Sequence, residues 1–457
     1  MVLINNIYDI LPRVGQTLML NAYGLKNHRR MLGYNRILSG IVSSEHWKTK
    51  RQIDYVSRRL RIILSHAINS VPRYKCLKHL LKPLNDPESD VFSILREFPI
   101  ITRSEILSEP ISFQSQVFKS RRIIKSKTSG TTGTPFTTLM DSKTFNLDKA
   151  LGFRRNLWAG YKKGDWVARL VGDPVVPLKC HDEKRPWRIS WTDKRLYLST
   201  FHLNRETARS YLNVMEEKQP AFLMGYPSSL QILAAYAIEE DRKLTWRPRA
   251  IFYSSEPMYE HQRDMILRVF RAPIRGFYGS AERIISAVEC EHGSYHLSMV
   301  DGYVEGQFSI LPQGVPSLMT TLVNRVMPLI RFRLGDVIRL SSNKKCSCGR
   351  TLPVIEPVVT KEEDWIETPN GRRVSSSALT WAFKDIKGIR CSQIIQVWKD
   401  KVEVHLDTDK EKFEQIVPLL KINLDKMLFG EMEIECIRNN NIKITKAGKT
   451  RFVIRKI

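Results

Sequence analysis

The apolar positions of the first hundred residues follow a helical period. From Tyr55 to Val71 they recur at spacings of three and four, which places them on one face of a helix. Pro72 ends this pattern, because proline disfavours helical geometry in the residue before it. We therefore expect residues 1 to about 100 to be mainly helical, with one amphipathic helix built on Tyr55, Leu60, Ile62, Ile63, Leu64, Ala67, Ile68 and Val71.

Short apolar runs alternate with helical patterns from about residue 100 to 355. Three runs are typical of buried strands: Trp166–Val171, Ala250–Tyr253 and Pro273–Tyr278. Between them, Leu203–Met215 and Ser228–Glu239 have the period of helices. This alternation predicts an α/β fold in which helices pack on a sheet.

A different pattern begins beyond a charged stretch near residues 356–371. It predicts two hairpin strands, then a helix and two further strands, at Ile394–Trp398, Val402–Leu406, Glu411–Lys426, Glu431–Ile437 and Asn441–Thr445. A small α+β domain fits this order. We expect a large domain over residues 1–358 and a small one over residues 359–457.

The net charge of the chain indicates which kinds of partner it attracts. The 457-residue chain has a formal net charge of +26, much of it in residues 43–83 and 438–457. Such a balance attracts polyanions. Neither stretch interleaves the aromatics on which nucleic-acid bases stack, so a solvated basic face, which contacts anionic lipid or no particular partner, is preferred and nucleic acid is the alternative.

The remaining composition indicates a cytoplasmic protein, peripheral at most to the inner membrane surface. Seven cysteines in so long a chain do not form a disulfide scaffold. Residues 1–12 lack the basic start and apolar core of a signal peptide. No uncharged apolar run reaches the length of a membrane-spanning helix.

The most informative motif is a run of small hydroxyl and glycine residues. It comprises Thr128, Ser129, Gly130, Thr131, Thr132 and Gly133, and follows a basic segment. Glycine lets successive N–H groups point at one anion, and hydroxyls add short donors, so the run predicts a phosphate cradle. A P-loop would need its own lysine, which this run lacks. A flexible linker is the alternative.

Four further segments agree with this motif: Phe277–Glu282, Leu329–Asp336, Thr360–Asp364 and Lys446–Arg451. In this order and spacing the chain resembles the adenylate-forming (acyl-CoA synthetase) superfamily, and within it the phenylacetate–coenzyme A ligase-like branch. Its N-terminal region, with Leu11–Pro12, Gly24 and Val71–Tyr74, is most similar to the CapK proteins of capsular polysaccharide biosynthesis.

The resemblance implies a two-step ligation. A small-molecule carboxylic acid attacks the α-phosphorus of ATP, releasing pyrophosphate, and the acyl-AMP then passes to a second nucleophile, usually coenzyme A. Lys449, Glu282 and Thr131 would be catalytic, with Glu282 holding Mg²⁺. The implied nucleotide contacts are Thr128, Ser129, Gly130, Thr131, Thr132, Gly133, Ser255, Glu256, Tyr278, Gly279, Ser280, Asp336 and Lys361.

Individual roles follow from the same resemblance. Tyr278 would lie against adenine, Asp336 would accept hydrogen bonds from the ribose hydroxyls, and Lys449 would place its charge near the α-phosphate. The alternatives are that Tyr278 is a core aromatic and that Glu282 and Asp336 are cap or surface carboxylates. Lys449, taken without the resemblance, is expected to be a solvated lysine. The small domain would rotate between the half-reactions about a hinge at residues 361–364.

Cysteine and histidine give a second signal. Cys290 and His296 follow the Phe277–Glu282 segment, and Cys346 and Cys348 follow Asp336. Two pairs of such ligands suit a closed tetrahedral zinc site, and members of the phenylacetate ligase-like branch have one. Unrelated free cysteines are the alternative.

The chain also departs from the family pattern. Thr360–Lys361 stands where the family has Gly-Arg, and lysine does not reproduce the guanidinium fork. This departure predicts an altered ribose contact and hinge, and with them a reduced or altered second half-reaction. The usual acceptor of the superfamily is coenzyme A, and the CapK resemblance implies an amine or hydroxyl of a sugar instead. A nucleotide-binding protein with reduced turnover is a further alternative. The acid, aryl or short acyl, is expected among residues 226–228, 254–257 and 277–278.

Overall fold

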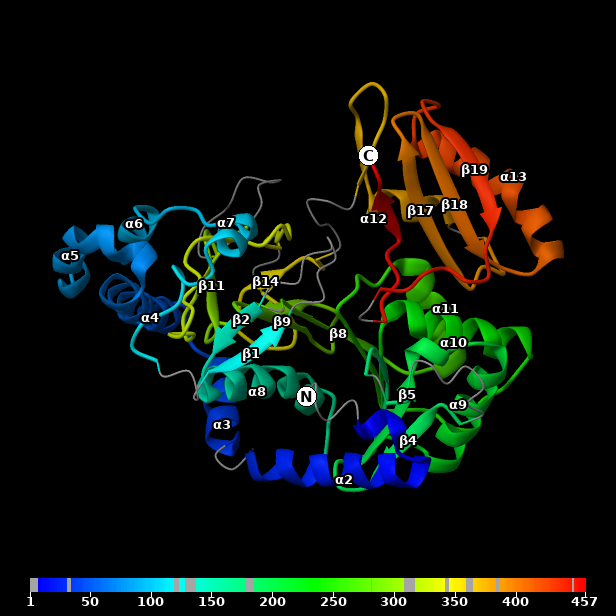
Figure 1. Ribbon diagram of the computed structural model, residues 1–457, viewed down its shortest axis with the longest axis horizontal. Helices are drawn as coiled ribbons and strands as arrows, with labels where there is room; N and C mark the ends of the chain where they lie inside the picture. The colour runs from blue at the N-terminus through cyan, green and yellow to red at the C-terminus, as the bar shows by residue number, and fades with distance from the viewer. Residues whose placement is uncertain are drawn as a thin grey trace. The chain divides into compact units, whose positions relative to one another are not determined.

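A computed structural model describes residues 7–30, 34–118, 123–127, 137–173, 175–177, 185–280, 282–307, 317–341, 345–358, 365–383, 386–445 and 448–457. The α/β class is confirmed. The chain forms two compact units: one comprises Met1–Arg30, Lys162–Ile274 and Val359–Ile457, and the other Met31–Tyr161 and Arg275–Val358. Below they are called unit 1 and unit 2. Figure 1 shows the elements of both.

The core of unit 1 is a sheet in the order β7-β6-β3-β5-β4. The first four strands are parallel and β4 is antiparallel at the edge. Their bounds are β3 Val167–Val171, β4 Trp187–Ser190, β5 Arg195–Ser199, β6 Phe222–Gly225 and β7 Ala250–Ser254. The helices of this part are α2 Arg13–Arg30, α9 Arg205–Lys218, α10 Pro227–Glu239 and α11 Glu260–Phe270, with the short η3 Thr200–His202. The predicted strands Trp166–Val171 and Ala250–Tyr253 and both predicted helices are confirmed, with ends that differ by at most three residues.

The C-terminal part of unit 1 has a four-stranded sheet in the order β19-β18-β17-β20. Its strands are β17 Cys391–Trp398, β18 Lys401–Asp407, β19 Glu433–Arg438 and β20 Val453–Arg455. Helix α13, Lys410–Met427, covers one face through Leu420 and Leu424, which are fully buried (Figure 1). A hairpin of β15 Trp365–Glu367 and β16 Arg373–Ser375 precedes the sheet, followed by α12 Ser376–Leu379 and η4 Thr380–Phe383.

One strand of this domain was predicted at the wrong place. Asn441–Thr445 forms no strand, and the last strand is β20, which pairs in parallel with β17. The apolar side chains at 442 and 444 alternate as in a strand, but Ile444 is 38% exposed and has no core to face. Alternation without burial does not fix a strand. The other three predicted strands and the helix are confirmed.

Unit 2 contains the helices of the N-terminal region. They are α3 Tyr34–Ser44, α4 Thr49–Ser70, η1 Pro72–Leu80, α5 Leu81–Asn85, α6 Val91–Arg96, α7 Arg103–Ser108 and α8 Ser142–Trp158. Helix α4 buries Leu60, Leu64 and Ile68 and ends before Pro72, as predicted. Among the described residues, no helix of the protein has both the length and the apolar content needed to cross a membrane.

The strands of unit 2 are antiparallel. Strands β8 Ile274–Gly279, β9 Ser286–Glu289, β10 Tyr295–Leu297 and β14 Val354–Ile355 pair in that order. A second sheet contains β11 Gly302–Val304, β12 Leu318–Thr321 and β13 Phe332–Arg333. A hairpin pairs β1 Ile124–Lys127 with β2 Thr137–Met140, and Lys127 lies opposite Thr137.

Candidate active site

Residues 128–133 of the cradle motif and Lys361 lie outside the described residues. The strands that flank the motif, β1 and β2, pair with each other. The segment therefore connects two strands of one hairpin, rather than two domains. The roles proposed for Thr128, Ser129, Gly130, Thr131, Thr132, Gly133 and Lys361 stay predictions.

Unit 2 brings Tyr278 and Asp336 together although they are 58 residues apart. Tyr278, near the end of β8, donates a hydrogen bond from Oη to Asp336 Oδ2 over 2.7 Å. Burial raises the pKa of Tyr278 well above its ordinary value, and the neighbouring Asp336 charge raises it further. The phenol is thus a neutral donor that holds the Asp336 carboxylate in one orientation.

Glu282 belongs to the same group of side chains. It is 5% exposed, and burial raises the pKa of its carboxyl group. The Asp336 charge acts in the same direction, while Arg103 of α7 lowers this pKa. A buried and a partly buried carboxylate that repel each other are stabilised by a divalent cation between or beside them. Glu282 and Asp336 therefore fit the predicted contact with a magnesium-bound nucleotide, and Gly279 and Ser280 lie on the same strand end.

Unit 1 holds the second predicted group around Glu256. The backbone N–H of Ser228, at the start of α10, donates to Glu256 Oε2 over 3.0 Å, and the Ser228 hydroxyl donates to Oε1 over 3.1 Å. The N–H of Thr450 donates to the same Oε1 over 3.1 Å. Burial raises the pKa of Glu256, whereas Ser228 and Lys449 lower it. Ser255, beside it, is exposed with φ of +74°.

Lys449 is placed by the turn that precedes it. Thr445 N–H donates to the Lys449 carbonyl and Gly448 N–H donates to the Thr445 carbonyl, each over 2.8 Å. Lys449 Nζ lies 5.8 Å from the centre of the Tyr226 ring. Together with the Thr450–Glu256 hydrogen bond, these contacts fix the lysine against the ends of β6 and β7.

Gly448 is required by both its conformation and its surroundings. Its φ is +71°, and a Cβ there would lie 2.6 Å from Thr200 Oγ1 and 3.1 Å from Gly172 Cα. Such distances exclude any side chain unless the turn moves away. The turn that carries Lys449 therefore approaches this surface as closely as backbone atoms allow.

Gly448→Ala is expected to displace Lys449 without unfolding the C-terminal domain. A shift of about 1 Å at a reacting group costs about 100-fold in rate, and we expect a loss of this order in acyl-AMP formation. Gly430→Ala is the matched control, because Gly430 also has a positive φ, of +69°, but its Cβ would meet only Asp425 Oδ2, at 4.0 Å. Equal losses in both variants would contradict the steric argument.

Cys290, His296, Cys346 and Cys348 form one cluster in unit 2, with all four ligand atoms within 4.8 Å of one another. The sulfurs of Cys290 and Cys346 are 3.6 Å apart, and Cys348 Sγ is 3.2 Å from His296 Nε2. Tetrahedral zinc would separate two sulfurs by about 3.8 Å and a sulfur and a nitrogen by about 3.6 Å. The residues that the sequence singled out thus fit a structural zinc ion.

An aromatic and ionic layer surrounds this cluster. The Trp158 ring packs edge-on against His296, with centres 5.9 Å apart, and Arg350 lies 3.9 Å over the same Trp158 ring. Trp158 Nε1 donates to Glu45 Oε1 over 3.0 Å. Arg154 is fully buried beside Trp158, and among the described residues its guanidinium has no hydrogen-bond partner. Burial lowers the pKa of the Arg154 guanidinium, and the nearby charges of Glu45 and Asp301 act in the opposite direction.

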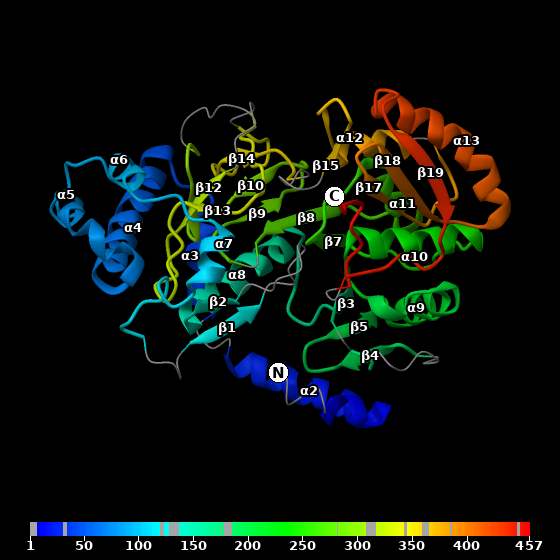
Figure 2. The ribbon, with the colours of Figure 1, turned by 45° about the horizontal axis from the view of Figure 1, so that its top comes forward.

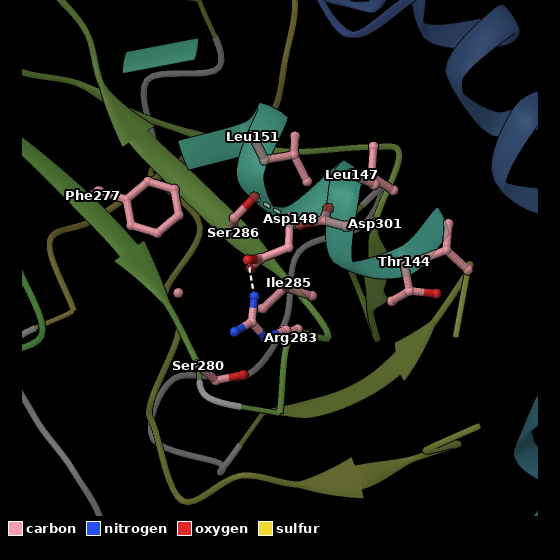
Figure 3. Close-up of a pocket in the computed structure, with 12 residues that line it drawn as sticks. Thr144, Leu147, Asp148, Leu151, Phe277, Ser280, Arg283, Ile285, Ser286 and Asp301 are labelled. Atoms are coloured by element: carbon pink, nitrogen blue, oxygen red, sulfur yellow. Dashed lines mark hydrogen bonds and ion pairs between the residues drawn. The ribbon is translucent and has the colours of Figure 1, made fainter. Parts of the chain in front are cut away.

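A cavity of about 70 Å³ lies next to the end of β8 in unit 2. Helix α8 supplies one wall with Thr144, Leu147, Asp148 and Leu151, and the other lining residues are Phe277, Gly279, Ser280, Arg283, Ile285, Ser286, Asp301 and Val323. Figure 3 shows the Arg283 guanidinium meeting the Asp148 carboxylate at this cavity. Ser286 donates to Asp301 over 2.7 Å, and burial raises the pKa of Asp301 to about 6.

Phe277 is the one described residue of the acid pocket expected from the sequence that lines this cavity. The residues of α8 and the Asp148–Arg283 ion pair were not predicted. Leu147 and Leu151 are four residues apart with Asp148 between them, a spacing that puts all three near one helix face. That pattern was available in the sequence. The partner of Asp148 was not, because Arg283 is 135 residues away.

The pattern of the CapK C-terminal domain matches residues 366–456. Protein CapK of Staphylococcus aureus is 24% identical over 377 residues, which is 79% of this chain and 80% of that protein.

Solved structures of a ligase also resemble this fold. The 2-hydroxyisobutyryl-CoA ligase in its postadenylation state with R3-HIB-AMP superimposes with a TM-score of 0.68 at 16% identity, over 90% of this chain and 91% of that one. The same ligase with 2-HIB-AMP and CoA in the thioesterification state gives a TM-score of 0.55 at 18% identity, with the same coverage.

These likenesses define the class of protein. The fold is α/β, with a large adenylate-forming-like domain and a small C-terminal domain. The chain is similar in sequence to Protein CapK and, over residues 366–456, to the CapK C-terminal domain, and its fold is similar to that of adenylate-forming ligases.

Proposed function

We propose that the protein is an ATP-dependent acid ligase that activates a carboxylate as its acyl-AMP and passes the acyl group to coenzyme A. The observation that carries this proposal is the group formed by the buried Glu282 and the partly buried Tyr278 and Asp336, which joins two sequence motifs into one polar site. The similar ligase structures hold acyl-AMP and CoA, which supports the same two steps here.

In the first step a carboxylate oxygen of the acid attacks the α-phosphorus of ATP, and the bond to pyrophosphate breaks. The crowded anionic transition state is stabilised by cations and preorganised donors. Lys449 supplies one such charge, and Glu282 would hold Mg²⁺, which would neutralise phosphate oxygens. Asp336, oriented by Tyr278, accepts hydrogen bonds from the ribose hydroxyls.

Hydroxylamine trapping tests this proposal. Hydroxylamine converts an acyl-AMP into a hydroxamate and AMP, so the protein, ATP, Mg²⁺ and the right acid should yield both products in equal amounts. Omission of the acid should abolish both. Tight ATP binding without AMP or hydroxamate for any acid would instead support a nucleotide-binding protein that no longer turns over.

We propose that the acid is short and carries a polar substituent, rather than an aryl group. The cavity beside β8 has about 70 Å³, whereas an engineered apolar cavity that binds benzene has about 150 Å³. Asp148, Arg283 and Asp301 line it, and buried polar groups favour ligands that form hydrogen bonds with them. A hydroxy or amino acid of a few carbons satisfies both conditions.

A panel of acids tests this substrate class. Short hydroxy and amino acids should support hydroxamate formation at least about 100-fold faster than benzoate or phenylacetate, because the ring does not fit. Leu147→Ala, which enlarges the α8 wall, should raise the rate with the aryl acids. Leu157→Ala on the same helix lies outside the cavity and should not. Faster reaction of wild type with aryl acids would contradict the assignment.

A second acceptor is favoured by the match of residues 366–456 to the CapK C-terminal domain. In that case an amine or hydroxyl of a sugar takes the acyl group in place of the thiol. Incubation of the protein with purified acyl-AMP and either coenzyme A or an amino sugar distinguishes the two, because the products are a thioester and an amide. Thioester formation alone would contradict the second candidate.

We also propose that the Cys290, His296, Cys346 and Cys348 cluster holds a structural zinc ion. All four positions are taken by protein ligands, which leaves no site for water or substrate. Zinc would therefore fix the β9–β10 hairpin to the segment around residue 348 and take no part in the reaction.

A further inference from the structure

Large apolar side chains gather on the exposed side of the N-terminal region. Six of them lie between residues 7 and 25, with exposed fractions from 44% to 81%: Ile7, Ile10, Val14, Leu18, Tyr23 and Leu25. Within α2, Val14, Leu18 and Leu25 are spaced by four and seven residues, which places them on one stripe of the helix. We call Val14, Leu18 and Leu25 the outer stripe.

The inner side of α2 is held by polar contacts. Gln16 is 3% exposed, its amide donates to the Leu11 carbonyl over 3.0 Å, and its Oε1 accepts from Nε and Nη2 of Arg188 over 2.8 and 2.7 Å. Asn21 Oδ1 accepts from the N–H of Trp191 over 2.8 Å. These contacts join α2 to edge strand β4 and the turn after it. Figure 2 shows α2 lying beside β4.

Close packing makes this orientation rigid. A Cβ on Gly24 would lie 2.2 Å from Thr192 Oγ1, so the helix backbone touches the turn directly. The helix cannot rotate to bury its outer stripe without breaking the Gln16 and Asn21 hydrogen bonds. A surface helix ordinarily turns its apolar face to the core, and α2 does the reverse. Its apolar face is therefore available to a partner.

The positive charge of the α2 segment indicates that its partner is anionic. Residues 10–30 contain Arg13, Lys26, Arg29 and Arg30 and no acidic residue, in a chain with a net charge of +26. Trp191, next to Asn21, is 54% exposed, and Lys218 Nζ lies 5.8 Å from its ring. An apolar helix face in a segment of basic sequence, together with an exposed tryptophan, is the combination found in helices that lie in the headgroup region of anionic bilayers.

We propose that α2 docks in the interface of a membrane containing anionic lipid, with the outer stripe facing the acyl chains. The docking would hold the ligase at the membrane surface, independently of its proposed reaction. The 18-residue helix stays in the plane of the interface, because its inner side is fixed to the protein by hydrogen bonds.

Vesicle co-sedimentation of the full chain tests the proposal. The protein should bind vesicles of phosphatidylcholine mixed with phosphatidylglycerol, and bind phosphatidylcholine alone much more weakly. V14E/L18E should bind the mixed vesicles at least about tenfold more weakly, since burying each of these side chains favours docking. Leu18→Ser provides a milder change, and both should keep the circular dichroism spectrum and hydroxamate formation of wild type.

The matched control is L419E/I422E on α13, where both side chains are about half exposed and far along the chain from α2. It should bind vesicles as wild type does. Equal binding by V14E/L18E and wild type would overturn the proposal. So would light scattering that shows a wild-type oligomer dissociated by V14E/L18E, because the outer stripe would then contact a second copy of this chain.

Discussion

Lys449→Ala is expected to reduce acyl-AMP formation by about 100- to 1000-fold, the usual cost of removing one preorganised charge from a transition state. The lysine lies on a turn closed by Thr445 and fixed by the Thr450–Glu256 hydrogen bond. Those contacts come from the backbone, so the substitution removes the ammonium group and leaves the turn in place. Hydroxamate formation under saturating ATP and acid measures the effect.

Transfer of the acyl group should survive this substitution. The variant, supplied with purified acyl-AMP and coenzyme A, is expected to form thioester at the wild-type rate, because the lysine charge acts on the α-phosphate in the first step. Lys443→Ala is the control: it removes an exposed lysine from the same basic segment and should leave both steps unchanged. Equal loss of both steps in Lys449→Ala would contradict the assigned role.

Loss of the proposed zinc ion is expected to have the largest effect on stability. Cys348→Ser replaces one of four ligands with a poor one, and the remaining three would no longer hold the ion tightly. We expect zinc content, measured by mass spectrometry of the metal, to fall from about one per chain to near zero. A loss of about 3 kcal/mol would lower the Tm by about 6–12 °C.

Cys76→Ser controls for the loss of a thiol in the same unit, because Cys76 is exposed and outside the cluster. It should keep both zinc and Tm. Chelation of wild-type protein should reproduce the Cys348→Ser result, and zinc should restore wild type alone. A wild-type protein purified without zinc, with a Tm insensitive to chelators, would show that the four residues are free thiols and a histidine.

The sequence predicted the fold where burial and pattern agree. Residues 250–253 form part of a strand buried on both faces, and helix α4 has one apolar stripe, so each pattern has one structural solution. It failed at Asn441–Thr445, where Ile442 and Ile444 alternate with polar residues but find no core. Strand β20 pairs in parallel with β17 after the turn that positions Lys449. The alternation of apolar and polar residues does not show that this turn comes before the last strand.

The candidate site was predictable where a motif fixes several residues at once. Tyr278 and Asp336 contact each other, as their motifs suggested. The three cysteines and the histidine form a separate cluster, also as suggested. Residues whose importance depends on contact with one particular partner were not predicted. Asp148 with Arg283, and Arg154 with Trp158, look like ordinary helical residues until the tertiary fold brings their partners close.

Exchange of radiolabelled pyrophosphate into ATP tests the central claim most directly, because it reports reversal of the adenylation step alone. With Mg²⁺ and a short hydroxy or amino acid, wild type should catalyse exchange that depends on the acid, needs no coenzyme A and falls about 100-fold or more in Lys449→Ala. Absence of exchange with every acid, in protein that still binds ATP, would contradict adenylation as the function of this chain.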